Sequence, residues 1–388
     1  MKRGRKEKNH ETSLSPSRLG CRRISTRNFN IPLDLTVEIL KKLPAKSLVR
    51  FKCVSKSWSS IISSRKDFID SIVTRSLTQP PRDAHLILDP DNATDECLLV
   101  ISSPCPQKTH KESVSILRTA HEYSRGLFLC WSNEHQEGAI YNPTTRQTFN
   151  LPKMKHSHGG VCFFGYEPLE NQYKVLFIPN LVHRVDQACQ VFTLGDTMAE
   201  EQWRNIQNIE YLYPSLRYRS TVSINGAIYF LVGIKVNDTT EYKILRFDIR
   251  SEKFYHVDAP KPVTLMMALG WCDLINYQGK LGLICCEQRM EIWIMEEDSE
   301  KKTQRWSKIF FYEMEGFDDW LISDVTRAGE IVFFNEPRDM LRICYYDPKR
   351  NSVRYVDLKE NYPKERGCDK ALLIRTFPDY AENTMCLY

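Results

Sequence analysis

The spacing of apolar residues divides the chain into two parts. Between residues 31 and 64, apolar side chains recur every three or four positions, and this spacing predicts short helices. From about residue 80 onward, short apolar runs alternate with polar turns, which is the pattern of β-strands. The sequence therefore predicts an α+β multidomain chain in which a small helical region precedes a larger all-β region.

Three short helices are predicted in the first part. Pro32 suits the start of the first helix, and Pro44 ends it because proline disfavours helical geometry in the residue before it. Ser47 and Ser55 are expected to cap the second and third helices. The region is therefore predicted as a compact three-helix unit.

Apolar side chains cover more than half of the first predicted helix. At 100° per residue they are contributed by Leu35, Val37, Ile39, Leu40 and Leu43. A unit below about 40 residues rarely stabilises itself by its own core. Burial of three or four such side chains in a partner groove, at roughly 1.5–3 kcal/mol each, would support a stable contact. Packing of these helices on the rest of the chain would give the same spacing.

The second part repeats weakly, with a period near 50 residues. Apolar runs opened by glycine begin at Gly126, Gly226, Gly279 and Gly329. Turn and tryptophan markers at positions 141, 203, 247, 306 and 346 give five units, each long enough for a four-stranded sheet. Runs at 86–88, 98–101 and 372–374 supply a sixth unit closed by both ends. We predict a kelch-like β-propeller of about six blades; a β-sandwich gives no reason for the period.

Positive charge is concentrated at the start of the chain. Residues 1–28 contain nine Lys or Arg and two Glu, and few aliphatic side chains, which predicts a disordered basic arm. A cluster such as KRGRK at residues 2–6 acts as a nuclear-import signal or binds phosphates in some proteins and is simply solvated in most. We therefore expect the protein in the nucleus, the cytoplasm or both.

Neither a membrane segment nor a metal site is evident. The longest apolar run, residues 227–234, is far shorter than the roughly 20 residues needed to cross a bilayer. The 13 cysteines include no C-x-x-C pair, so we expect reduced thiols rather than a disulfide framework. His156, His158 and Cys162 offer zinc no fourth ligand. No metal or cofactor is predicted.

The helical segment carries a family resemblance. Residues 31–58, IPLDLTVEILKKLPAKSLVRFKCVSKSW, resemble the F-box of plant F-box proteins, although the family more often has Leu in place of Ile31 and Cys in place of Ser55. In that family the F-box, here residues 29–70, binds the Skp-type adaptor of SCF (Skp, cullin, F-box) ubiquitin ligases. The resemblance implies adaptor contact, or support for it, by Pro32, Leu35, Ile39, Leu40, Leu43, Pro44, Leu48, Val54 and Trp58.

The β region resembles the F-box-associated domain of the same plant family. The matching motifs are Gly126-Leu127, NPTTR at 142–146, FGY at 164–166, YKV at 173–175, Trp203-Arg204, Asn225-Gly226 and Phe247-Asp248. Glu167 stands where the family often has Asp. The resemblance implies that residues 80–380 form a domain that holds a substrate or another partner protein.

No sequence motif of hydrolysis, nucleotide chemistry or direct ubiquitin transfer is present, so the chain is predicted to be non-catalytic. Aromatic side chains on propeller loops would anchor a substrate well, and Tyr211, Tyr213 and Tyr218 are the first candidates. Trp131 and Trp320 are weaker candidates, because aromatic residues pack between blades more often than they bind partners.

Two functional classes follow from these features. The first is the substrate receptor of an SCF ligase, in which the F-box binds the adaptor, and through it cullin, while the propeller presents an unknown protein substrate. The second is an F-box scaffold outside a ligase, or a scaffold that binds nucleic acid through its basic arm. Of the two kinds of partner, nucleic acid is less favoured than protein. An enzyme with an unrecognised site is held in reserve.

Overall fold

Four helices precede the β region in the computed structural model. The structure describes residues 31–80, 82–88, 96–102, 110–115, 120–132, 137–154, 159–179, 188–195, 202–206, 221–236, 239–260, 267, 272–286, 289–298, 303–313, 320–335, 342–357 and 373–387. The helices are α1 (Leu33–Lys41), α2 (Ala45–Phe51), α3 (Lys56–Ser64) and α4 (Lys66–Thr78). Within these residues no helix is long and apolar enough to cross a membrane. The predicted basic arm, residues 1–28, lies outside the described residues.

The helices share a core of their own, formed by Val37, Leu40, Ala45, Leu48, Ile61, Ile62, Phe68 and Ile72. Ser55 caps α3 as predicted, because its hydroxyl accepts a hydrogen bond from the Trp58 amide at 3.1 Å. The predicted cap at Ser47 is wrong: α2 begins at Ala45, directly after Pro44. The helical region is also longer than expected, since α4 adds a fourth helix.

The strands among the described residues form six four-stranded antiparallel sheets, and the predicted β-propeller is confirmed. The closing sheet contains β24 (Leu373–Phe377), β1 (Asp83–Leu88), β2 (Glu96–Ser102) and β3 (His110–Ser115). The next two contain β4 (Ala120–Ser124), β5 (Leu127–Ser132), β6 (Glu137–Asn142) and β7 (Gln147–Asn150), then β8 (Gly160–Glu167), β9 (Gln172–Pro179), β10 (Gln190–Leu194) and β11 (Arg204–Asn205).

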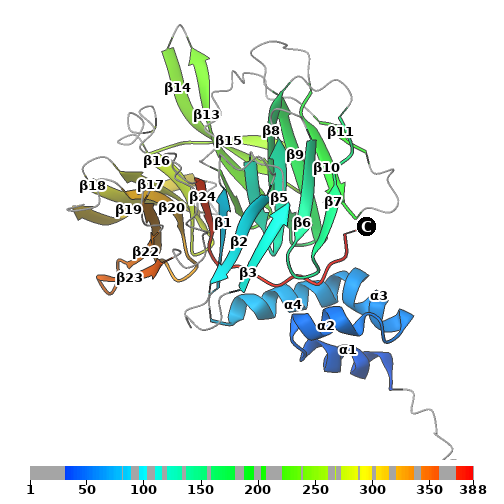
Figure 1. The fold of residues 1–388 in the computed structure, drawn as a ribbon. Helices are drawn as coiled ribbons and strands as arrows, with labels where there is room; N and C mark the ends of the chain where they lie inside the picture. Colours follow the sequence, from blue (N-terminus) through cyan, green and yellow to red (C-terminus); the bar gives the residue numbers. More distant parts are fainter. Residues whose placement is uncertain are drawn as a thin grey trace, which may run out of the picture.

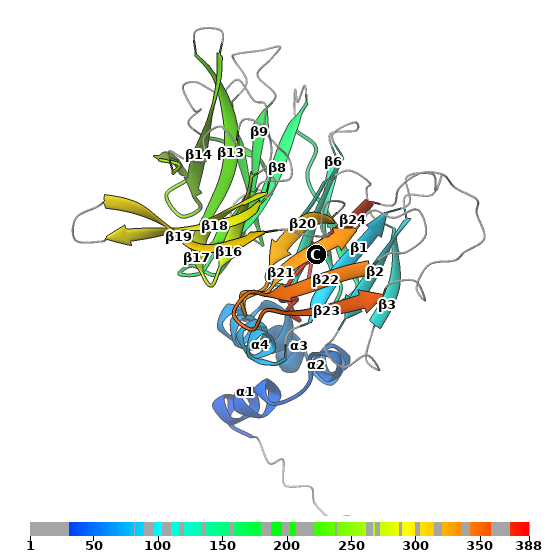
Figure 2. The same ribbon diagram turned by 90° about the vertical axis from the view of Figure 1, so that its left-hand side faces the viewer.

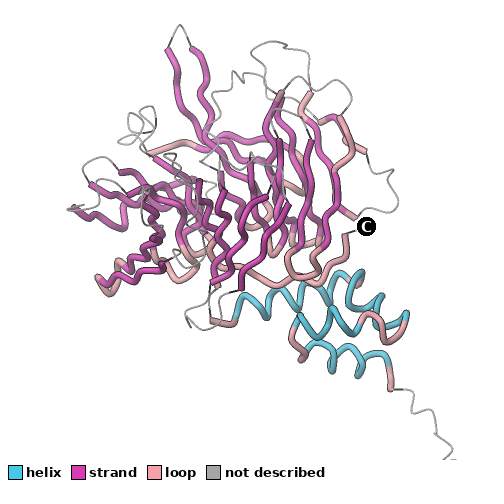
Figure 3. The backbone as a smooth tube through the Cα atoms, viewed as in Figure 1, coloured by secondary structure: helices cyan, strands magenta, loops and turns pink. Residues whose placement is uncertain are grey.

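All the sheets lie on one side of the helices in Figures 2 and 3, and the three remaining sheets follow in chain order. They contain β12 (Thr221–Ile224), β13 (Ala227–Val236), β14 (Thr239–Asp248) and β15 (Lys253–Val257); β16 (Cys272–Tyr277), β17 (Lys280–Cys286), β18 (Arg289–Asp298) and β19 (Thr303–Glu313); and β20 (Trp320–Val325), β21 (Ile331–Asn335), β22 (Arg342–Asp347) and β23 (Ser352–Asp357). The five sequence markers fall in or beside five different sheets, which explains the period near 50 residues.

The glycines that opened the predicted units sit in turns between the first and second strands of their sheets. Arg125-Gly126, Asn225-Gly226 and Gln278-Gly279 all have positive φ at both residues, with Gly126 at 89°, Gly226 at 80° and Gly279 at 83°. Two successive residues with positive φ are typical of the type I′ hairpin turn, which favours glycine at the second position. The glycine signal in the sequence is therefore a signal of hairpin turns.

Both ends of the β region close the propeller, as the sequence predicted. The C-terminal strand β24 pairs with β1 in antiparallel register, from Ala84 opposite Phe377 to Leu88 opposite Leu373. This pairing makes β24 the end strand of the closing sheet and gives β1 a hydrogen-bonded partner on each side, β24 and β2. Neighbouring blades also pack through aromatic side chains; the Phe163 and Phe230 rings, for example, stack with centroids 5.1 Å apart.

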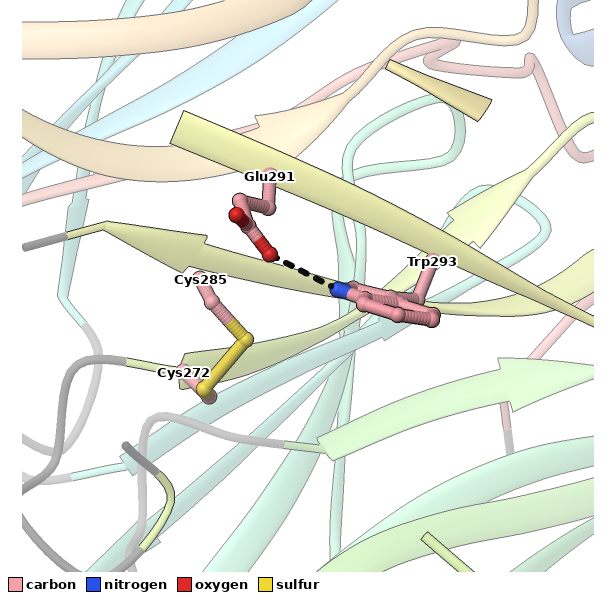
Figure 4. Close-up of a disulfide and its surroundings, with 4 residues drawn as sticks. All are labelled: Cys272, Cys285, Glu291 and Trp293. Atoms are coloured by element: carbon pink, nitrogen blue, oxygen red, sulfur yellow. Dashed lines mark hydrogen bonds between the residues drawn. A yellow bond between two sulfur atoms is a disulfide. The ribbon is translucent and has the colours of Figure 1, made fainter. Parts of the chain in front are cut away.

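Two cysteines form a disulfide across β16 and β17, Cys272 with Cys285 (Figure 4). The antiparallel register places them directly opposite each other, with Cα atoms 4.1 Å apart. The expectation of reduced thiols is wrong for this pair, because register brings together two residues that share no local motif. Cys162 and Cys344 are buried free thiols, in line with the expectation.

Candidate functional site: an exposed apolar face on the helices

The first helix has apolar residues on two of its sides. Val37 and Leu40 point into the helical core, where they are 4% and 0% exposed. Leu35 and Ile39, one helical turn apart, remain 56% and 49% exposed. A helix that supports only its own core needs a single apolar stripe. The outward side of α1 is therefore surplus to the folding of the helices.

Other apolar residues extend this exposed surface. Ile31 is 54% exposed and Leu33 is 55% exposed at the start of α1, and Val54 is 57% exposed after α2. We call Ile31, Leu33, Leu35, Ile39 and Val54 the exposed apolar face. Single exposed apolar residues are ordinary, but five on one small helical unit indicate an interaction site.

The structure separates the nine residues assigned to adaptor contact or its support into three groups. Pro32, Leu35, Ile39, Pro44 and Val54 are exposed. Leu43 and Trp58 are partly buried against the helical core, where the Trp58 ring meets Phe51 edge-on with centroids 5.8 Å apart. Leu40 and Leu48 have no exposed surface, so they hold the helices together and do not form the outer contact. Sequence spacing missed Leu33, which precedes the first turn of the predicted stripe.

Basic side chains surround the exposed apolar face. Residues 31–56 contain six Lys or Arg against two Asp or Glu, a surplus of four positive charges. Lys42, Lys46, Arg50 and Lys56 are exposed. Glu38 is paired with Lys41 at 3.0 Å, which reduces the local negative charge further. The arrangement fits a partner that combines an apolar groove with acidic residues at its rim.

Burial of this surface would contribute a substantial share of the free energy of a binding interface. Complete burial of an aliphatic side chain contributes about 1.5–3 kcal/mol, so burial of the exposed halves of five gives about 4–8 kcal/mol before ordering costs. The residues already sit on helices with a packed core, so little ordering is required. The helices can therefore act as a preformed docking element.

The predicted substrate anchors have different outcomes. Tyr211, Tyr213 and Tyr218 lie outside the described residues. Trp131 is wrong as an anchor, because it is 1% exposed and packs between strands beside Phe177. Trp320 begins β20, but its side chain is not among those described.

A cavity of about 800 Å³ occupies the centre of the propeller and reaches Leu77 at the end of α4. Glu122, Asp273 and Asp324 line it. Burial raises the pKa of Asp324 to about 7. Among the described residues no group of His, Cys, Asp or Glu is arranged to hold a metal ion. His156 and His158, the weak zinc candidates, lie outside the described residues.

Comparison with known proteins identifies both modules. Residues 29–70 match the F-box domain family, and residues 86–381 match the F-box associated beta propeller domain family. Two Arabidopsis thaliana relatives named as F-box proteins are 46% identical over the full length of both chains and 52% identical over 78% of this chain and 99% of the relative. A third from the same organism is 40% identical over 93% of this chain and 88% of its own. The chain therefore belongs to the plant F-box proteins that carry an F-box-associated β-propeller domain.

Proposed function

We propose that this protein is the substrate-recognition subunit of an SCF ubiquitin ligase. An F-box domain implies binding of a Skp-type adaptor, and the observation that carries the proposal is the exposed apolar face on the F-box helices. Adaptor contact is assigned to Pro32, Leu35, Ile39, Pro44 and Val54, with Leu40, Leu43, Leu48 and Trp58 supporting them from below. The ligase role is then one of binding and presentation, and the chain itself needs no catalytic group.

The propeller is proposed to hold the substrate at the face away from the helices. The Arg125-Gly126 turn lies at the helix side, because Arg125 pairs with Asp70 of α4. The Asn225-Gly226 turn lies on that same side, and it bonds to the next blade through Asn225 and the Gly279 carbonyl at 3.1 Å. β12 starts at Thr221 and runs toward this turn, so Thr221 marks the far face. The segment with Tyr211, Tyr213 and Tyr218 leads into Thr221, and these tyrosines stay predicted substrate contacts.

Co-purification tests the proposal. The full chain is expressed with a Skp-type adaptor and a cullin, and the complex is isolated through a tag on the F-box protein. Recovery of all three chains in equal amounts is expected. Adaptor without cullin would favour a scaffold outside a ligase, and a folded chain that recovers neither would contradict the proposal.

A further inference from the structure

The last described residues of the chain lie between the helices and the propeller, along the lower edge of the sheets (Figure 1). We call residues 379–387, which follow β24, the C-terminal strap. Residues beyond the last strand of a domain are usually poorly ordered unless contacts tie them down. Here Tyr380, Ala381, Asn383, Thr384 and Leu387 are buried. Burial of the strap to this extent indicates a structural task beyond closing the last blade.

One set of strap residues binds the helices. The Glu382 amide donates to the Ser76 hydroxyl of α4 at 2.9 Å, and the Cys386 amide donates to the Ser63 carbonyl of α3 at 3.2 Å. Lys52, at the end of α2, donates to the Cys386 sulfur at 2.8 Å. The strap is therefore bonded to residues of three helical segments.

A second set of strap residues binds the propeller. The Ala381 amide donates to the Tyr123 hydroxyl at 2.8 Å, the Asn383 amide donates to the Thr144 hydroxyl at 2.9 Å, and the Leu387 amide donates to the Gln147 side chain at 3.3 Å. In an extended chain, successive backbone groups point to opposite sides. The Glu382 and Cys386 amides therefore reach the helices, and the Ala381, Asn383 and Leu387 amides reach the propeller.

Asn383 is the central residue of the strap. Its side-chain amide donates to the Arg125 carbonyl at 2.9 Å and to the Tyr173 hydroxyl at 2.8 Å. The backbone carbonyl of Asn383 accepts a hydrogen bond at 3.0 Å from the Asn142 side chain, which also donates to the Met385 backbone carbonyl. Because Asn383 is fully buried, each of these polar groups depends on its protein partner.

Apolar contacts follow the same division. Ala381 packs against Ile69 and Val73 of α4, with Met385 beside them. Leu387 belongs to the apolar cluster of the second and third blades, which Met385 also contacts. The strap thus carries buried surface toward both modules.

Direct polar contact between α4 and the propeller centres on Asp70. Its carboxylate accepts from Arg125 at 2.5 Å and from the Tyr166 hydroxyl at 3.2 Å. Asp70 is 40% exposed in its side chain, and ion pairs at that exposure contribute little and are screened by salt. The direct contact alone is a weak basis for a fixed orientation.

We propose that the C-terminal strap locks the F-box helices and the propeller into one rigid body. The alternating amides, the buried Asn383 and the apolar contacts of Ala381, Met385 and Leu387 all join the two modules through the same nine residues. The lock itself does not depend on the ligase role. Its consequence does rest on the proposed function: a substrate on the propeller would be held at a set distance from the adaptor.

Pulsed electron spin resonance tests the lock through the distance between two spin labels. The labels are attached to a non-natural ketone amino acid, which leaves the native cysteines untouched, at exposed Lys46 in α2 and exposed Lys253 in β15. The wild-type chain is compared with a chain that ends at Ala381 and with full-length Asn383→Ala. Asn150→Ala, at an exposed position of β7, is the matched control.

A single narrow distance distribution is expected for the wild type and for Asn150→Ala, and loss of that distribution for both strap variants. Circular dichroism and thermal unfolding check that each variant folds. An unchanged narrow distribution in folded strap variants, or a broad one in the wild type, would overturn the proposal. If the shortened chain does not fold, Asn383→Ala decides. Adaptor binding is scored separately, so failure of the lock and failure of the ligase assignment are distinguishable.

Discussion

Leu35 and Leu40 lie on opposite sides of α1, with 56% of Leu35 exposed and none of Leu40. Leu35→Ala is therefore expected to change the stability of the helices by less than about 0.5 kcal/mol, as is usual for surface positions. Leu40→Ala is expected to cost about 2–5 kcal/mol, because it leaves a cavity in the core. Native-state hydrogen exchange of the α1 and α2 amides measures both values, and equal losses at the two positions would contradict the two-sided helix.

Buried His85 predicts a loss of stability in acid. Burial, with the nearby Arg354 charge, lowers the pKa of His85 to about 3. The unfolded chain takes up a proton near pH 6.5 and the folded chain does not, so the stabilisation is complete above pH 6.5 and is lost as the pH falls toward 3. When the pH falls from 7 to 5, the free energy of unfolding measured in urea should decrease by about 2 kcal/mol more for the wild type than for His85→Asn. Parallel pH profiles would contradict the assignment.

The Cys272–Cys285 disulfide is expected to stabilise the fifth blade. The bond joins residues that are 13 positions apart, and closing a loop of this size lowers the conformational entropy of the unfolded chain. This effect stabilises the folded state by about 3 kcal/mol. A reducing agent should therefore lower the melting temperature of the wild type and leave that of Cys272→Ser unchanged. Mass spectrometry of the blocked, unreduced protein identifies the linked pair. If both thiols are blocked as free cysteines, the bond is absent under those conditions.

Gly126 and Gly159 both have φ of 89°. Alanine at these two positions therefore separates the cost of the backbone conformation from the cost of a clash between the added Cβ and its neighbours. A Cβ on Gly126 would lie 2.5 Å from the Ala381 carbonyl oxygen and 2.8 Å from the Asn383 Cβ, whereas a Cβ on Gly159 would have no neighbour within 4 Å among the described residues. Alanine at either position costs about 1 kcal/mol for the backbone conformation. Gly126→Ala should cost clearly more in thermal unfolding, because the strap must move. Equal losses would show that the strap yields without cost.

Much of the fold was predictable because its signals are local. The type I′ turns favour glycine after a residue with positive φ, so Gly126, Gly226 and Gly279 mark the positions of three blades in the sequence. The closing blade followed from apolar runs at both ends of the β region. Helix α4 was missed although its buried residues Phe68, Ile69, Ile72 and Val73 have regular helical spacing.

The remaining features depend on contacts between residues far apart in the chain. Cys272 and Cys285 meet only because of strand register. The strap residue Asn383 has partners more than 200 residues away and no periodic pattern of its own. On α1, the spacing identified the apolar positions but did not show which of them would be buried in the helical core. Burial placed Leu40 in that core and left Leu35 and Ile39 outside it.

The affinity of the full chain for a Skp-type adaptor tests the central claim most directly. Isothermal titration compares the wild type with Leu35→Asp/Ile39→Asp and with Leu169→Asp, a control at a leucine on the propeller that is 70% exposed. Because an unpaired charge is costly to bury, the double variant should bind at least about 100-fold more weakly, a loss of roughly 3 kcal/mol, while the control binds as the wild type does. Unchanged affinity of a folded double variant would contradict docking through the exposed apolar face.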